Sequence, residues 1–419
     1  MLYHFFEFLE KNVDLPGTGL FRFLTFRAGL AIIISLIISM VFGSRIIKFL
    51  KRKQIGESVR DLGLEGQKEK EGTPTMGGLI IVLGILVPTL LLADLTNIYI
   101  QLMLLVTCWM AVIGFADDYI KVFKGKKKGL SGKLKVIGQV GLGLIVGVVM
   151  LAHQDIVVRV SLETAQEKGY EIIRVVERPQ LFNNTEQVEM AYAKTKLTNV
   201  PFFKGNNLDY KGLVAFAGDN AAKISDILFV ILVIFIVTAV SNAANLTDGL
   251  DGLAAGVSAI AGAILGVFAY VSGHNIFADY LSILYLPFSG ELVVFSAAFI
   301  GACIGFLWYN AYPAKIFMGD TGSLTIGAII ASLAIILRKE LLIPILCGIF
   351  LIENLSVIIQ VAWFKYTKKR YGVGKRVFLM APLHHHFQKQ GMHESQIVTR
   401  FWIVGVLLAV ITVITLKIR

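Results

Sequence analysis

Residues Phe317 to Leu324 read Phe-Met-Gly-Asp-Thr-Gly-Ser-Leu, an acidic turn bounded by glycines and set between two long apolar runs. A carboxylate at the centre of a bilayer costs about 3 kcal/mol even on the most lenient insertion scale. We therefore expect Asp320 to lie at a membrane face, where water, a cation or a phosphate group can reach it.

The same placing of acids at the end of an apolar run occurs twice more. Asp117 and Asp118 close the run that starts at Val112, and the stretch Asn245 to Gly252, Asn-Leu-Thr-Asp-Gly-Leu-Asp-Gly, opens another. If these ends share one side of the membrane, four or five carboxylates gather at one mouth. Such a set predicts a site for a divalent cation and a phosphorylated ligand.

The composition predicts a polytopic α-helical membrane protein. The mean hydropathy is +0.71, hydrophobic residues make up 56% of the chain, and apolar runs of about 20 residues recur along it. The net charge of +11 comes from lysines and arginines clustered in a few loops between the runs, so nucleic acid is not an expected partner. Cys108, Cys303 and Cys347 lie in apolar runs and are expected to be small core residues.

Charge in the short loops predicts the orientation of the spans. Basic stretches at 45–53, 124–135 and 365–400 are expected on the cytoplasmic side, which places both termini outside. Ten spans are expected, at 29–42, 76–93, 98–116, 136–152, 227–244, 253–271, 292–309, 324–337, 341–364 and 401–416. In this arrangement every acidic motif and the histidine run near 385 face the cytoplasm. The predicted fold class is an all-α polytopic membrane protein with its active-site cleft at the cytoplasmic face.

One segment, 153–223, is not membrane-like. It has mixed charge, a β-prone run from Tyr170 to Val176, and breakers such as Pro179 and Gly205. We interpret residues 1–419 as a single integral membrane domain in which 153–223 is an extended periplasmic loop between spans four and five. It is expected to pack on the outer ends of neighbouring spans or on a second copy of the chain, away from the chemistry.

The first acidic pair allows two interpretations. Asp117, Asp118 and Lys121 could form a surface ion pair that ends a helix. Two adjacent carboxylates repel each other unless a cation or a proton neutralises them, which favours a site.

The other two acidic motifs have equally plain alternatives. Asn245, Asp248 and Asp251 are spaced three apart, and they could be an N-cap with first-turn acids. Capping needs one such residue, however, and three are present. Asp320 could be a simple turn acid before a helix start, but the three motifs together favour a shared site.

The run His384, His385 and His386 could bind zinc, but consecutive histidines cannot all converge on one ion. Hydrogen bonding to a phosphate or a sugar fits better. The candidate phosphate contacts elsewhere are lysines: Lys70, Lys121 and Lys133. The polar side chains within span nine, where they must face protein or a water-filled cleft, are Glu353, Asn354 and Gln360.

Five motifs, taken together, resemble one family along the whole chain. They are Thr73-Pro-Thr-Met-Gly-Gly78, Asp117-Asp-Tyr-Ile-Lys121, Asn245-Leu-Thr-Asp-Gly-Leu-Asp-Gly-Leu253, Phe317-Met-Gly-Asp-Thr-Gly-Ser323 and Ala381-Pro-Leu-His-His-His-Phe387. The chain resembles phospho-N-acetylmuramoyl-pentapeptide-transferase (MraY), of the polyprenyl-phosphate sugar-1-phosphate transferase superfamily. The acidic motifs are shared across the superfamily, whereas the triple-histidine loop points to the muramoyl-pentapeptide branch. The long 153–223 segment departs from the short hairpin expected there.

The resemblance implies an activity and a place for it. The chain is expected to transfer phospho-MurNAc-pentapeptide from UDP-MurNAc-pentapeptide to undecaprenyl phosphate, giving lipid I and UMP with Mg²⁺, in the first membrane step of peptidoglycan synthesis. That step serves cell-wall biogenesis, cell shape and cell division at the bacterial inner membrane. The expected partners are the two substrates, membrane lipid and a second copy of the chain as a homodimer.

The resemblance also implies roles for individual residues. Asp320 would ligate Mg²⁺, while Asp117 and Asp118 would position or deprotonate the lipid phosphate. Lys121 and the histidines His384, His385 and His386 would join the catalytic set, with the histidines on the sugar-phosphate side. The substrate pocket would comprise Lys70, Thr75, Lys133, Asn242, Asn245, Asp248, Asp251, Asn310, Phe317 and Gln360. Within that pocket Asp251 would lie near uracil, with Phe317 packed against the base.

Two alternatives stay open. A GlcNAc-1-phosphate transferase shares the acidic motifs, and competition between UDP-sugars separates the two activities. An ion-coupled transporter also places acids between helices, but near the bilayer midplane rather than at helix ends. A direct attack by the lipid phosphate is favoured over a covalent phospho-enzyme.

Overall fold

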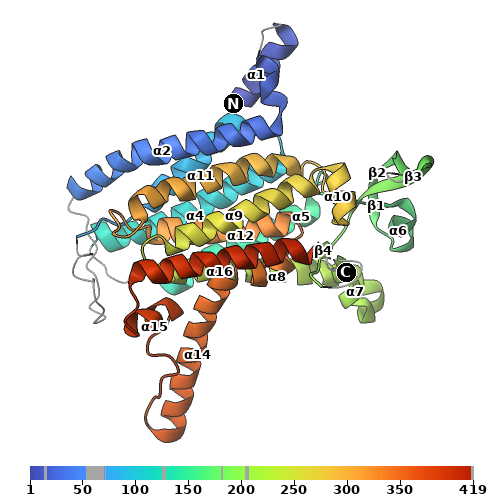
Figure 1. The fold of residues 1–419 in the computed structure, drawn as a ribbon. Coiled ribbons are helices and arrows are strands. Elements are labelled where there is room, and N and C mark those ends of the chain that lie inside the picture. Colours follow the sequence, from blue (N-terminus) through green and yellow to red (C-terminus); the bar gives the residue numbers. More distant parts are fainter. Residues whose placement is uncertain are drawn as a thin grey trace.

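The computed structural model describes residues 1–13, 17–52, 70, 72–124, 129–180, 183–202 and 207–416. Most of these residues are helical, and the long helices run side by side in one bundle (Figure 1). Within the described residues, nine helices are long and apolar enough to cross a membrane, and the shorter α3 (Gly78–Leu92) is also apolar. The nine are α2 (Leu24–Arg52), α4 (Ile98–Phe123), α5 (Gly132–Ala152), α8 (Ala221–Thr247), α9 (Leu253–Ser272), α11 (Leu292–Asn310), α12 (Gly319–Ile336), α14 (Gly348–Tyr371) and α16 (Glu394–Thr415). The prediction of a polytopic all-α protein is confirmed.

Helix α12 is the centre of the bundle. Its most apolar window is 89% buried, against 28% for α2 and for α14. It packs on α4, α8, α3 and α9. A helix that is apolar on every side can be surrounded by other helices in this way. The acidic motif that begins α12 is therefore delivered to the middle of one end of the bundle.

Span nine differs from its prediction. Residues 341–364 were expected to form one helix, but η5 (Glu340–Leu342) and α13 (Ile343–Leu346) come first, and α14 begins only at Gly348. Pro344 starts the short α13, which ends at Cys347. Helix α14 then leaves the bundle and projects away from the other helices (Figure 1).

The two ends of the bundle carry different short elements. At one end lie α10 (Asn275–Leu281) and the strands, and at the other lies α15 (Leu383–Lys389) (Figure 1). The remaining short elements are α1 (Leu2–Asn12), η1 (Thr18–Arg22), α6 (Leu162–Glu167), α7 (Tyr210–Leu213), η3 (Ala215–Asn220) and η4 (Ser289–Glu291).

The segment between α5 and α8 contains two small antiparallel sheets. One has the order β1-β3-β2, from β1 (Val158–Ser161), β2 (Glu171–Gln180) and β3 (Asn183–Lys194). The other pairs β4 (Leu197–Asn199) with β5 (Asn207–Asp209). The strand expected over Tyr170 to Val176 is present as β2.

Hydrogen bonds fasten this segment to the ends of neighbouring helices. The backbone N–H of Asn199 donates to the Arg338 carbonyl over 3.0 Å at the end of α12. The Tyr210 hydroxyl donates to Glu340 over 2.9 Å. In the first sheet, the Arg159 guanidinium donates to Asn275 of α10 over 2.7 Å. The expectation that the segment packs on neighbouring spans agrees with these contacts.

Candidate active site

The first turn of α12 is held by a carboxylate from α4. Asp118 accepts hydrogen bonds from the backbone N–H groups of Asp320, at 3.0 Å, and Thr321, at 2.9 Å, and from the Thr321 hydroxyl at 2.6 Å. A negative charge is favoured there because a helix N-terminus presents unpaired N–H groups. Gly319 precedes this turn with φ of 71°, and a Cβ added to it would lie 2.6 Å from Asp118. Only glycine therefore fits beside the carboxylate.

Two lysines join Asp117 to Asp320. The Lys121 ammonium lies 2.6 Å from Asp117 and 3.3 Å from Asp320. The Lys135 ammonium lies 3.0 Å from Asp117 and also forms a short ion pair with Asp320. Asp117 is fully buried and Asp320 nearly so, so each carboxylate needs this neutralisation.

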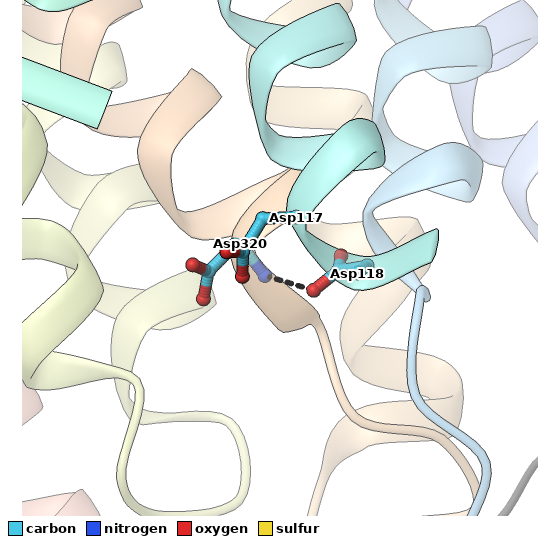
Figure 2. Close-up of side chains that lie close together, drawn as sticks. All are labelled: Asp117, Asp118 and Asp320. Carbon is cyan, nitrogen blue, oxygen red and sulfur yellow. Dashed lines mark hydrogen bonds between the residues drawn. The ribbon is translucent and has the colours of Figure 1, made fainter. Parts of the chain in front are cut away.

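The three aspartates form a candidate metal centre. Figure 2 shows Asp117 and Asp118 on α4 facing Asp320 on α12. One oxygen from each carboxylate lies within 4.8 Å of the others, and no other such group occurs among the residues that the structure describes. An octahedral Mg²⁺ with bonds of about 2.1 Å needs ligands roughly 3–4 Å apart, so a small adjustment would suffice. The donor set is all oxygen, as Mg²⁺ prefers, and it fits the ion.

The second acidic motif reaches the same point through Asn245. Its side-chain amide donates to Asp320 over 3.0 Å and to the Ser323 hydroxyl over 2.8 Å. Asn242, one turn earlier on α8, donates instead to Gln139 of α5 over 2.8 Å. Three of the four or five carboxylates expected at one mouth, Asp117, Asp118 and Asp320, therefore come together, and the second motif joins them through the Asn245 amide.

Asp251 belongs to a second, adjoining cluster. The Lys70 ammonium lies 2.7 Å from Asp251 and 2.6 Å from Glu394. Asp251 also accepts from the Ala314 N–H over 2.9 Å. Burial alone would lower the pKa of Lys70, but the two carboxylates outweigh it and raise that pKa. Lys70 therefore carries a full positive charge between the α8–α9 turn and the start of α16.

Three of the predicted pocket residues shape the loop before α12. The Phe317 N–H donates to the Pro74 carbonyl over 2.8 Å, directly beside Thr75, and the Phe317 carbonyl accepts from Gly77 over 2.8 Å. Asn310 donates to the Ile316 carbonyl over 2.9 Å and accepts from the Gly252 N–H over 3.0 Å. The Asn310 side chain thereby ties this loop to the α8–α9 turn.

Each histidine of the triple run has a different partner. His384 is buried against Glu353, with 3.0 Å between Nδ1 and Oε2. His385 is half-buried, and its Nδ1 lies 2.8 Å from Gln388 Oε1. His386 Nδ1 accepts from the Leu379 N–H over 3.1 Å. The three rings do not converge on one ion, as the sequence predicts.

Some predicted pocket residues are used differently. The Gln360 amide is taken up by the backbone of the loop after α14, donating to Phe378 over 3.1 Å and accepting from Val377 and Phe378 over 3.0 Å each. Lys133 is exposed in the first turn of α5, two residues before the lysine that reaches the aspartates. Asp248 is half-buried beside Gly249.

Sequence reasoning missed Lys135 and Glu394. Helical periodicity could have found Lys135, since it lies four residues before Gln139 and seven before Leu142, which are both buried. Glu394 is the first residue of α16, and an acid at a helix start is too common to distinguish by sequence.

Comparisons with known proteins give one family. The profile described as Glycosyl transferase family 4 matches residues 190–338, and Phospho-N-acetylmuramoyl-pentapeptide-transferase signature 1 matches residues 70–82. The chain is 58% identical over 419 residues to a phospho-N-acetylmuramoyl-pentapeptide-transferase of Flavobacterium psychrophilum, with 100% of both chains covered. Transferases of the same name from Parabacteroides distasonis and Flavobacterium johnsoniae are each 56% identical, again with 100% of both chains covered.

Proposed function

The chain belongs to the phospho-N-acetylmuramoyl-pentapeptide-transferase family, and from this we infer that it transfers phospho-MurNAc-pentapeptide from UDP-MurNAc-pentapeptide to undecaprenyl phosphate. The products are lipid I and UMP, and the reaction belongs to peptidoglycan synthesis. The observation that carries the inference is the similarity along the full length of both chains. The buried aspartate cluster supplies the chemistry that such a transfer needs.

We propose Mg²⁺ as the cofactor, held by Asp320 and Asp117. Both carboxylates are shared between the same two lysines, so a cation that takes them frees Lys121 and Lys135 to face phosphate oxygens. Asp118 already accepts three hydrogen bonds from α12, and we assign it chiefly to holding that helix in place. The bound ion would offset negative charge on the pyrophosphate.

The proposed reaction is a direct displacement. An oxygen of the lipid phosphate bonds to the phosphorus that carries the sugar, the bond from that phosphorus to the bridging oxygen breaks, and UMP leaves with the electron pair. A phosphate monoester has a second pKa of about 6, so it is largely ionised at neutral pH and needs no base. Asp117 is neutralised by two ammonium groups in this structure and would be neutralised by the cation when it is bound, so it is better suited to position the reactants than to remove a proton.

The adjoining cluster is our proposed nucleotide side. Lys70, Asp251 and Glu394 form a charged group that the loop from Ala314 to Phe317 borders. Asp251 near the uracil ring and Phe317 packed against it remain predictions. Exchanging Phe317 for leucine should weaken UMP binding measured by calorimetry, and unchanged binding would count against this placement.

We further propose that this end of the bundle faces the cytoplasm, at the bacterial inner membrane. The support is the lysine-rich loops at 45–53, 124–135 and 365–400, since short cytoplasmic loops are enriched in lysine and arginine. Single cysteines introduced in 129–135 should be labelled only from inside, and in 158–171 only from outside. The opposite labelling would reject this orientation.

The activity has a decisive assay. Purified protein should release UMP from UDP-MurNAc-pentapeptide when undecaprenyl phosphate and Mg²⁺ are present, and should stop when the metal is chelated. UDP-GlcNAc should neither react nor compete. Release of UMP from UDP-GlcNAc instead would move the chain to the GlcNAc-1-phosphate branch. A homodimer also stays a prediction, which sedimentation of the detergent-solubilised protein tests.

A further inference from the structure

Glu353 is a buried carboxylate of α14 that the transfer reaction does not yet use. Its side chain is 0% exposed. One carboxylate oxygen lies 3.0 Å from His384 Nδ1, and the other accepts from the His384 backbone N–H over 3.2 Å. Burying a carboxylate is costly unless it is hydrogen-bonded. Here both oxygens of Glu353 contact His384, one at its ring and one at its backbone, so Glu353 holds the ring and the backbone of His384 in place.

This pairing determines which nitrogen of His384 carries the proton. Because Nδ1 faces a carboxylate, Nδ1 is the donor and Nε2 is left without a proton. His384 is also 0% exposed, and within the described residues Nε2 is buried with no hydrogen-bond partner. A substrate therefore has no access to His384 in this structure.

The far side of the His384 ring rests on Gly249. A Cβ built on Gly249 would lie 2.3 Å from Nε2, which is too close for any side chain. Gly249 does not have a left-handed backbone conformation, so the requirement for glycine is one of space alone. His384 therefore fills the gap between α15 and the turn that follows α8.

That turn and the next histidine both adjoin the His384 ring. The turn carries Asp248 and Asp251, and Asp251 is paired with Lys70. Burial chiefly lowers the pKa of His385 to about 4, although the hydrogen bond with Gln388 opposes this shift. The ring centroids of His384 and His385 lie 4.2 Å apart, so His385 is next to the ring that rests on Gly249.

We propose that Glu353 is a positioning residue, and that His384 is a spacer between α15 and the α8–α9 turn rather than a catalytic residue. The inference rests on the proposed function, because it concerns the nucleotide side of that same site. Glu353 fixes His384, and His384 fixes the separation of α15 from the α8–α9 turn. The pair therefore governs binding of the UDP-linked substrate and leaves binding of the lipid phosphate alone.

Two replacements of His384 separate the two ring nitrogens. Asparagine places an amide N–H near the position of Nδ1 and keeps the bond to Glu353, whereas glutamine places its amide near the position of Nε2. We expect His384→Asn to keep the KM for UDP-MurNAc-pentapeptide within about threefold of wild type, and His384→Gln and Glu353→Gln to raise it about tenfold or more. The KM for undecaprenyl phosphate should not change. If His384→Gln is the better enzyme of the two, Nε2 acts on the substrate and the proposal is wrong.

A double-mutant cycle with Gly249 tests the contact itself. Gly249→Ala should impair UDP-substrate binding in the wild-type chain because the methyl group meets Nε2. In the His384→Asn background the same methyl group enters the space that the ring has left, so Gly249→Ala should be neutral or favourable. Equal effects of Gly249→Ala in both backgrounds would show that the contact does not set the spacing.

The controls separate this inference from the proposed function. The thermal midpoint in detergent is measured for every variant, so that loss of folding is recognised, and UMP binding by calorimetry measures the affinity of the nucleotide side directly. If wild-type protein fails to form lipid I, the function is rejected, whatever the variants do. If wild-type protein is active and Glu353→Gln has unchanged KM values, only the positioning role is rejected.

Discussion

Asp320 of α12 is contacted by Lys121, Lys135 and Asn245, so its carboxylate is the point where α4, α5 and α8 meet α12 at the site. Asp320→Asn keeps the volume and removes the charge. We expect transfer to fall below detection because a metal ligand and the partner of two lysines are both lost. The measurement is UMP release at saturating substrates, and an unchanged thermal midpoint in detergent is the control for folding. Turnover like that of the wild type would reject Asp320 as a ligand.

Lys135 and Lys133 offer a matched comparison on one helix turn. The Lys135 ammonium lies between Asp117 and Asp320, whereas Lys133 is exposed. Lys135→Met should lower kcat about 100-fold, the effect of losing one preorganised charge in a buried site. Lys133→Met should leave kcat unchanged. The reverse order would mean that the exposed lysine moves into the site when substrate binds.

The comparison of these lysines shows how far single residues could be predicted. Acids at helix ends were identified correctly as neighbours, because a charge in an apolar chain has few places to lie. Which of several lysines reaches these acids depends on where α5 begins, because the N-cap at Ser131 sets which of its side chains face the bundle. The buried partner of His384 was equally out of reach, because Glu353 lies 31 residues away on another helix.

At the scale of elements, the start of α12 depends on Asp118. Asp118→Asn removes the charge that faces a helix N-terminus and replaces one of the two accepting oxygens by an amide NH2, which cannot accept. We expect a loss of about 1 kcal/mol or more in the free energy of unfolding, together with weaker transfer because Asp320 moves with the helix. Thermal denaturation in detergent measures the first effect. An active variant with a lowered midpoint would confirm that Asp118 acts mainly as a clamp.

Element boundaries follow local rules that long-range packing then modifies. Ten apolar helices could be predicted from hydropathy, since each long apolar run has a single way to satisfy its backbone in a membrane. The break before α14 could not be predicted. Pro344 near a helix start and the end of α13 before Cys347 leave the apolar composition unchanged, so 341–364 looks like one uninterrupted span.

At the scale of the whole molecule, the segment between α5 and α8 and the aspartate cluster lie at opposite ends of α12, since Asp320 is in its first turn and Arg338 follows its last residue, Ile336. The segment still contacts α12, the helix that carries Asp320 at its other end, through Asn199 and the Arg338 carbonyl. Its parts should therefore differ in importance. The outer part of the β2–β3 hairpin is expected to be dispensable, whereas the β4 region is expected to stabilise the central helix.

One deletion and one pair of point variants test this difference between the hairpin and the β4 region. Val175 pairs with Ala191, so a two-residue Asn-Gly turn in place of 176–190 closes the hairpin and keeps the β1–β3 pairs of Val158, Arg159 and Val160, losing that of Ser161 with Met190. Transfer should stay within about threefold of wild type, since exposed loop tips tolerate such changes. Tyr210→Phe, by contrast, removes the donor to buried Glu340 and should cost about 1–3 kcal/mol of stability. Tyr170→Phe is the matched control and should lower the thermal midpoint less, because among the described residues the Tyr170 hydroxyl donates to Asp209 of the same segment. If the shortened hairpin folds and inserts but loses transfer as completely as Asp320→Asn, the outer segment must act on the site across the bundle.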